Sequence, residues 1–172
     1  MSLAWLSLGN AHHALCAHDA ALRAYDQALR LRPELASARL NRALTLLALG
    51  DFARGLPEYE ARLELAATAD AASGRAVQCA LPRWHGEPIE TRTLLVETEQ
   101  GFGDTLQFMR FVPLARERAG RVVFAVQPEL LPLVEPLGPL WRVKIVARDE
   151  ARVEADLQCP LLSLPLALGT RR

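Results

Sequence analysis

The chain has few cysteines, almost no lysine, no net charge and no long apolar run. Its 172 residues include three cysteines, and the one lysine is Lys144. Cysteines this few and widely spaced make no disulfide framework, which favours a reducing compartment. Twenty basic residues balance twenty acidic ones. A balanced charge has no electrostatic footprint for nucleic acid, so we expect no nucleic-acid partner.

Membrane and secretion signals are missing as well. No apolar stretch approaches the ~18 residues of a membrane helix, and no basic segment followed by an apolar run opens the sequence. We therefore expect a cytoplasmic protein without a membrane span. His12 and Cys16 lie one helical turn apart and resemble metal ligands. Zinc takes about four ligands, so we expect a packing role for them and no metal.

One fixed period organises the first third of the chain. Tyr25 and Tyr59 are 34 residues apart, and the same offset relates Leu6 to Leu40. This is the period of the tetratricopeptide repeat (TPR). The resemblance to that family covers about residues 2–66 and rests on Trp5, Leu8, Gly9, Ala21, Tyr25, Ala28 and Pro33. We expect helices near 3–16, 20–31, 36–49 and 53–66.

The second repeat departs from the family pattern. Arg39 and Arg42 stand where Trp and Leu are expected, and Gly55 replaces a small Ala. Pro57 lies near the start of the last helix, where it removes a backbone donor. We expect a delayed start or a kink in that helix.

The TPR resemblance implies a protein-binding surface. In that family the first helix of each repeat lines a concave face, which implies a protein or peptide partner for Asn10, His13, Asn41 and Leu44. Asparagine side chains can bind a peptide backbone without reading its sequence. The alternative is that these residues only pack neighbouring repeats against each other.

A composition change separates the repeats from the rest of the chain. Residues 66–78 are rich in Ala, Ser, Thr and Asp and extend the last helix or form a loop, whereas Pro82 and Pro88 interrupt any helix. Trp84 is expected to be a buried anchor. We expect TPR repeats over 1–68, a linker over 69–91 and a second domain over 92–172.

The second domain alternates strands with helices. We expect a helix over Asp104–Ala119, kinked at Pro113, and a short helix over Pro128–Leu137, with a helical turn ending at Gly169. This order predicts a Rossmann-like parallel sheet. The fold class is thus α followed by α/β. The expected strands are Thr93–Thr98, Arg121–Gln127, Arg142–Ala147 and Ala155–Cys159.

The turn after the first strand carries the functional signal. Gly101 and Gly103 permit positive φ and close ligand approach. Asp104 follows at the helix start, held by backbone N–H groups, and is either a general base or only an N-cap. Leu106 occupies the third glycine position of a dinucleotide fingerprint. We therefore expect no nicotinamide cofactor, and no other resident cofactor is implied.

The segment Gln100–Phe111, with Trp84-His85-Gly86 before it and Leu162–Pro165 after it, resembles a bacterial family. In that family a TPR array is fused to a heptosyltransferase-like glycosyltransferase of the two-Rossmann (GT-B) type. The resemblance implies that Asp104 is the catalytic base toward a sugar acceptor. It implies substrate contacts from Gln100, Gly101, Gly103, Thr105, Gln107 and Arg110.

The GT-B resemblance also implies a missing part. Such enzymes bind the nucleotide-sugar donor in a second Rossmann domain, so we expect this chain to be an incomplete product, inactive alone. The alternative is a pure TPR binding module whose α/β half is a non-catalytic cap.

Overall fold

A computed structural model describes residues 1–73, 81–149 and 153–170. The chain divides into two compact units, with the boundary between Gln78 and Cys79.

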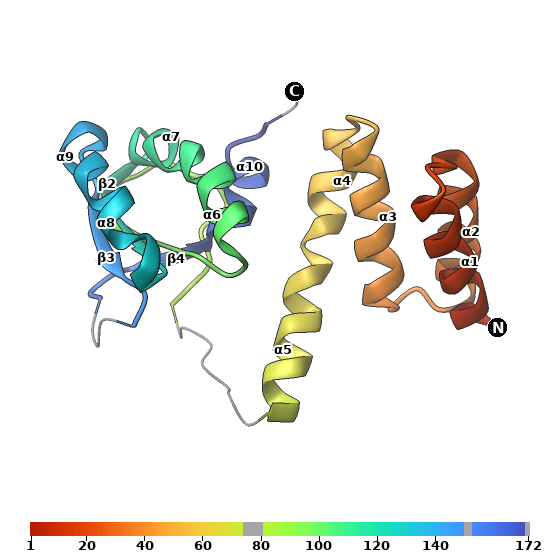
Figure 1. Ribbon diagram of the computed structural model, residues 1–172. Helices are drawn as coiled ribbons and strands as arrows, with labels where there is room; N and C mark the ends of the chain where they lie inside the picture. Colours follow the sequence, from red (N-terminus) through yellow and green to blue (C-terminus); the bar gives the residue numbers. More distant parts are fainter. Residues whose placement is uncertain (74–80, 150–152, 171–172) are drawn as a thin grey trace. The chain divides into compact units, whose positions relative to one another are not determined.

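The amino-terminal unit is a series of antiparallel helices (Figure 1). The first three predicted helices are confirmed and begin and end within two residues of their expected bounds, whereas the fourth, predicted over 53–66, is divided into two helices. The helices are α1 (Ser2–Ala14), α2 (His18–Leu31), α3 (Ala36–Ala48), α4 (Phe52–Tyr59) and α5 (Ala61–Ser73).

Small residues let the helices of each hairpin approach closely. A Cβ added to Gly9 on α1 would lie 2.4 Å from Cε1 of Tyr25 on α2, whose ring is 1% exposed. In the second hairpin, a Cβ on Gly55 would lie 2.8 Å from the side chain of Leu47. Both glycines are therefore required by packing, because real Cβ atoms do not approach other atoms so closely.

The expected irregularity near Pro57 takes the form of a break. Helix α4 starts at Phe52, so its start is not delayed; Pro57 lies inside it, and regular helix stops at Tyr59 and resumes at Ala61. Arg62 stabilises the break, since its guanidinium donates to the Tyr59 carbonyl at 3.2 Å and to the Glu60 carboxylate at 2.7 Å. The helix then continues to Ser73, which settles the first part of the 66–78 segment as helical.

The second unit contains one four-stranded sheet, all parallel in the described residues, with order β3-β2-β1-β4. The chain runs outward from β1 through β2 to β3, then returns to place β4 on the other side of β1. The strand order therefore reverses between β1 and β4. The strands are β1 (Ile89–Glu97), β2 (Ala119–Val126), β3 (Lys144–Ala147) and β4 (Leu157–Pro160).

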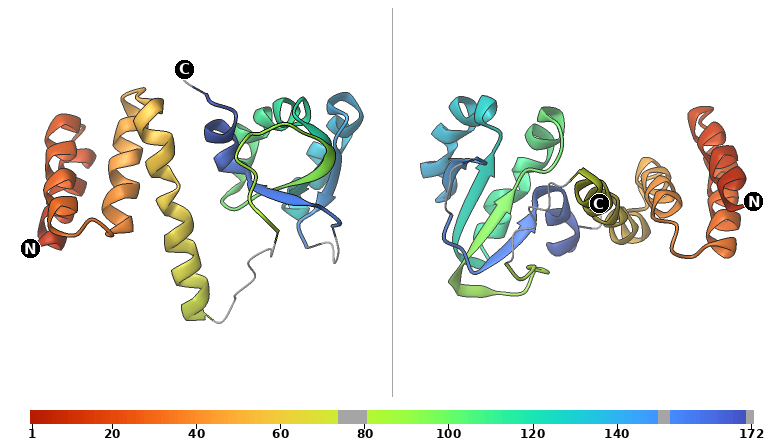
Figure 2. Two further views of the ribbon diagram at one scale, coloured as in Figure 1. Left: turned by 180° about the vertical axis from the view of Figure 1, so that it is seen from behind. Right: turned by 90° about the horizontal axis from the view of Figure 1, so that it is seen from below.

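Short helices after β1 and β2 cover one face of this sheet (Figure 1). In the view turned by 180°, the strands lie nearer to the viewer than these helices (Figure 2, left). Phe124 of β2 is 0% exposed and lies on the sheet face opposite Val123, because side chains alternate along a strand. The helical segments are α6 (Phe102–Phe108), η1 (Met109–Phe111), α7 (Val112–Arg116), η2 (Pro128–Leu130), α8 (Leu131–Val134), η3 (Glu135–Leu137), α9 (Gly138–Trp141), η4 (Leu161–Ser163) and α10 (Leu164–Ala167).

A continuous helix over Asp104–Ala119 is wrong. Helix α6 begins at Phe102, a 3₁₀ turn follows at Met109, and α7 ends at Arg116 because Ala119 already belongs to β2. Proline explains the change of helix type, since Pro113 has no N–H to donate to the carbonyl of Met109.

The segment before β1 closes the outer edge of β4. The backbone N–H of Trp84 donates to the Gln158 carbonyl at 2.8 Å, and that of Gln158 donates to the Pro82 carbonyl at 3.0 Å. Trp84 is 1% exposed and its indole donates to the Glu87 carbonyl at 2.7 Å. Its predicted role as a buried anchor is confirmed.

Candidate functional site

Two asparagines connect the first helices of the two hairpins. Asn10 on α1 accepts from the Tyr25 hydroxyl at 3.0 Å and from Nδ2 of Asn41 on α3 at 2.7 Å, all at its Oδ1. Neither Nδ2 of Asn10 nor Oδ1 of Asn41 makes a hydrogen bond within the described residues. The pair thus joins the repeats and still presents one donor and one acceptor.

The other two predicted residues of this face differ from each other. His13 Nδ1 lies 2.8 Å from the Thr45 hydroxyl, which is 0% exposed, so His13 joins the repeats. Leu44 on α3 is 42% exposed. The packing alternative therefore describes His13, while Leu44 remains open for contact.

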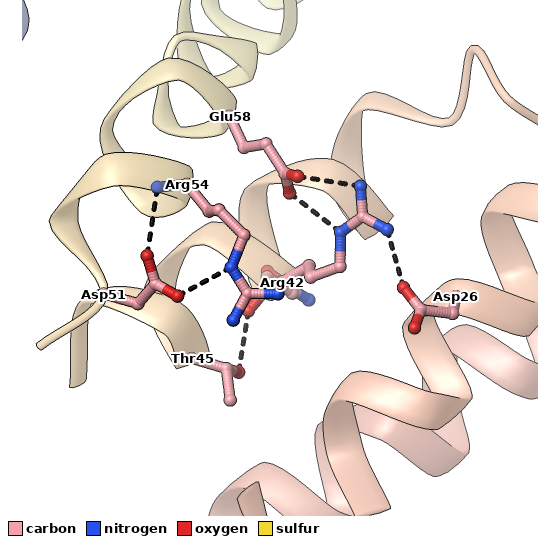
Figure 3. Close-up of polar contacts among 7 residues, drawn as sticks. Asp26, Arg42, Thr45, Asp51, Arg54 and Glu58 are labelled. Atoms are coloured by element: carbon pink, nitrogen blue, oxygen red, sulfur yellow. Dashed lines mark hydrogen bonds and ion pairs between the residues drawn. The ribbon is translucent and has the colours of Figure 1, made fainter. Parts of the chain in front are cut away.

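Arg42 links three helices (Figure 3). Its guanidinium forms a bidentate pair with Glu58 of α4, with both N–O distances 2.8 Å, and a third bond of 2.6 Å to Asp26 of α2. Burial acts to lower the pKa of Arg42, but the carboxylates of Glu58 and Asp26 outweigh it and raise the pKa. The arginine in place of the family's leucine therefore connects the first hairpin to the second.

Arg39 has a comparable role. It pairs with Glu64 on α5, on the far side of the break at Glu60. Sequence reasoning noted both arginines as departures and missed their partners, which lie 16 and 25 residues away.

In the second unit, the polar residues at the carboxyl ends of the strands meet where the strand order reverses. Ligands of open α/β sheets bind in the crevice at such a point. The turn from β1 to α6 lies here, and so does the start of η4 after β4: the Leu162 N–H donates to Oε1 of Glu99 at 3.2 Å. Glu99 thus joins the two connections.

Asp104 lies in the first turn of α6, and the N-cap is Gly101. Both sequence-based statements about its backbone role are corrected: Asp104 is not the N-cap, and no backbone N–H donates to it within the described residues. The side chain is half-buried, neither sealed off nor fully exposed. Its carboxylate has no hydrogen bond or ion pair in this part of the chain.

Gly101 and Gly103 do not adopt positive φ, contrary to expectation. Gly101 has φ −71 and ψ 172, and Gly103 lies inside α6, whereas the glycines with positive φ among the described residues are Gly50, Gly86 and Gly169. A Cβ on Gly103 would meet no atom within 4 Å, and one on Gly101 would meet only Oδ2 of Asp104, at 3.7 Å. Neither backbone conformation nor packing requires glycine at these two positions.

A buried polar network holds the turn. The hydroxyl of Thr105, 1% exposed, donates to Oε1 of Gln127 at 3.0 Å and lies 3.3 Å from the Gly101 carbonyl. Nε2 of Gln127 donates to the Gln100 carbonyl at 2.8 Å. Thr105 therefore positions the turn through Gln127. The role of Gln127 was not predicted from the sequence, although its position directly after β2 places it at the carboxyl-terminal edge of the sheet.

Three further polar groups follow β1 and β3. Burial raises the pKa of Glu97, Arg148 lowers it and Glu99 raises it further, with a net upward shift. Thr98 is 2% exposed, and its hydroxyl has no hydrogen-bond partner among the residues that the structure describes. Nη1 of Arg148 donates to the Thr98 carbonyl at 3.2 Å. The edge thus holds a partly buried carboxyl group beside an unpartnered hydroxyl.

The remaining predicted substrate contacts are open to solvent. Gln100, Gln107 and Arg110 are exposed, and the guanidinium of Arg110 lies 5.2 Å from the ring centre of Phe111. Among the described helices, none has the length and hydropathy of a membrane span.

Comparison with known proteins agrees with the repeat assignment. The tetratricopeptide repeat family matches residues 2–35. Protein FlbA of Caulobacter vibrioides is 35% identical over 150 residues, which are 85% of this chain and 23% of FlbA. The chain thus spans less than a quarter of that relative's length. No solved structure matches the chain. The TPR match supports a protein-interaction role for the first unit.

Proposed function

We propose that this chain is a TPR protein-interaction scaffold joined to the acceptor-binding half of a GT-B glycosyltransferase. The proposed interaction scaffold is the first unit, and the proposed half-domain is the second unit, which includes Trp84 and the whole of β1. The proposed catalytic base is Asp104. Binding of the nucleotide-sugar donor is assigned to a second domain of the intact enzyme.

The observation that carries the proposal is a pair of glycines that the fold does not need. Glycine inside a helix costs about 0.5–1 kcal/mol relative to alanine. Gly103 lies in the first turn of α6, so its cost is at most about this value, and neither packing nor a dihedral angle gives a reason for it. Gly103 lies after β1, where the strand order reverses and where ligands of such sheets bind. A ligand there would need the space that a side chain at this position would fill.

Asp104 is suited to proton transfer from a sugar hydroxyl. Its carboxylate is half-buried and makes no internal hydrogen bond, so its lone pairs are available. A general base needs to come within about 2.6–3.2 Å of the proton donor. Thr105 and Gln127 hold the backbone that carries it, while Gln100, Gln107 and Arg110 supply exposed polar groups for the acceptor.

The partner proposed for the repeats is an extended peptide. Nδ2 of Asn10 and Oδ1 of Asn41 match the donor–acceptor alternation of a peptide backbone. Leu44 lies on α3, about one helical turn after Asn41, and adds an apolar contact. His13 contributes through Thr45, by holding α1 against α3.

A titration with sugars tests the acceptor site. Amide chemical shifts of the ¹⁵N-labelled chain would be followed while neutral hexoses and heptoses are added at millimolar concentrations. We expect the largest changes in the amides of Gly101, Gly103 and Asp104. Changes confined to other residues, or none with any sugar, would reject the acceptor assignment.

A selection with displayed peptides tests the repeat surface. Peptides that bind the chain would be measured by calorimetry against Leu44→Glu and, as a matched control, Leu31→Glu, since Leu31 on α2 is also exposed, at 53%. We expect Leu44→Glu to abolish binding and Leu31→Glu to preserve it. Equal loss in both variants would contradict the assignment of the surface.

The second candidate is a pure TPR binding module with a non-catalytic α/β half. The extent of the family match favours it, because that match covers residues 2–35 and lies entirely in the repeats. Peptide binding without any sugar-dependent shift near Asp104 would select this candidate.

A further inference from the structure

A basic recess lies at the amino-terminal edge of the sheet, opposite the edge that carries Asp104. Its volume is about 430 Å³, within the range of small-molecule sites. The residues around it come from the starts of the strands, the ends of α7 and α9, and the segment before β4. Its polar and charged lining residues are Thr93, Arg116, Arg121, Arg142, Lys144 and Glu154.

The charges of the recess are not balanced internally. Among the described residues that line it, four are basic and one, Glu154, is acidic. Arg116 donates to the carbonyls of Arg142 and Ala119, at 3.2 and 2.6 Å. The side chains of Arg121, Arg142 and Lys144 have no hydrogen bond or ion pair in the described parts of the chain. A surplus of positive charge therefore faces this recess.

Strand register places two of these cations on one sheet face. Val123 of β2 is the partner of Lys144 of β3, and Arg121 shares a face with Val123 because side chains alternate along a strand. Arg121 in turn pairs with Thr93 of β1. On that face Val123 packs with Leu81, Val153 and Ala155, and none of these three residues lies in a helix.

The backbone around the recess is irregular in a way that packing enforces. The β1–β2 register shifts between Ile89 and Thr93. At the shift a Cβ on Gly120 would lie 2.2 Å from the Glu90 carbonyl oxygen, so only glycine allows the two strands to meet there. Asp156 directly precedes β4, which pairs with β1 on the side opposite β2. Its Oδ2 accepts a hydrogen bond from the Thr93 N–H at 2.7 Å. That carboxylate is already engaged with backbone.

We propose that this recess binds a small molecule through a diphosphate group. Four cations less the one carboxylate leave a local charge of about +3, which complements a multiply charged anion rather than a single carboxylate. Arginine forks bind phosphate oxygens in pairs and lysine adds a point charge. The whole chain has no net charge, so the attraction is local to this recess. The proposal is independent of sugar transfer.

Calorimetry on the whole chain tests it with three probes: inorganic pyrophosphate, inorganic phosphate and adenosine diphosphate. We expect saturable pyrophosphate binding that weakens as sodium chloride is raised, with phosphate weaker. Adenosine diphosphate binding more tightly than pyrophosphate identifies a phosphate ester as the ligand class. Pyrophosphate binding as tightly or more tightly identifies the free anion.

A pair of double variants locates the binding. Arg121→Gln with Lys144→Gln removes two exposed cations of the recess, and we expect at least about a tenfold loss of affinity. The matched control, Arg23→Gln with Arg32→Gln, removes two exposed cations from α2 and its C-cap and should keep the wild-type affinity. Absence of saturable binding to all three probes, or equal affinity in the recess variant and the wild type, would overturn the proposal.

Discussion

Replacing Arg42 should loosen the connection between the two helical hairpins. Arg42→Met keeps the apolar stem and removes three charge-assisted hydrogen bonds, two to Glu58 and one to Asp26. The side chains of Arg42 and Glu58 are each 24% exposed. Their ion pair is therefore intermediate between surface pairs, which are worth about 0–1 kcal/mol, and buried pairs, whose disruption costs about 3–5 kcal/mol. We expect a loss of about 2 kcal/mol.

Thermal unfolding followed by helix circular dichroism measures this loss. For a unit of this size it corresponds to a decrease of roughly 10 °C in the melting temperature of the helical transition. Hydrogen exchange should show faster exchange in α3 and α4, with no change in the β strands. A double-mutant cycle with Glu58→Gln should give a coupling energy of about 1.5 kcal/mol.

The matched control for this prediction is Arg54→Met. Arg54 is 68% exposed and pairs with Asp51 within its own turn, at 2.6 Å (Figure 3), so its loss should leave the melting temperature little changed. The reasoning is refuted if Arg42→Met is as stable as the wild type, or if the two variants are equally destabilised.

Two other substitutions test packing and charge. Gly9→Ala should destabilise the repeats by about 1–3 kcal/mol, because its Cβ would lie 2.4 Å from the Tyr25 ring; an unchanged urea midpoint would contradict this. The pKa of Glu97 is raised, and burial is the first cause. At pH values above its ordinary pKa of 4.5, folding is therefore accompanied by proton uptake. Its stabilising contribution is full below that value and is lost as pH rises through the folded-state pKa. Glu97→Gln should therefore gain stability relative to the wild type as the pH rises from about 4 to about 8; a difference that does not vary with pH would contradict the burial argument.

The periodic elements were predictable because their signals are local. The 34-residue spacing of Tyr25 and Tyr59 fixes the helical hairpins, since each repeat must pack small residues against a large one. Alternation of strands and helices likewise predicts a parallel sheet. The interruption at Glu60 was less accessible, because the side chain that stabilises it, Arg62, reads as an ordinary helix residue.

The candidate site was predictable only in part. Sequence order placed Gly101, Gly103 and Asp104 directly after β1, but it could not show that Gly101 is the N-cap, since the helix start depends on how the turn is held. Gln127, which directly follows β2 and lies 22 residues beyond Thr105, holds that turn. Such long-range hydrogen bonds leave no periodic trace in a sequence.

Gly103→Ala tests the central claim most directly, because it separates folding from ligand binding. The variant and the wild type would be compared by urea unfolding and by the sugar titration of Gly101, Gly103 and Asp104. We predict that the variant is at least as stable as the wild type, with a gain of up to about 1 kcal/mol, and binds the sugar at least about fivefold more weakly. Unchanged sugar affinity, or a loss of stability, would contradict the claim that this glycine makes room for a ligand.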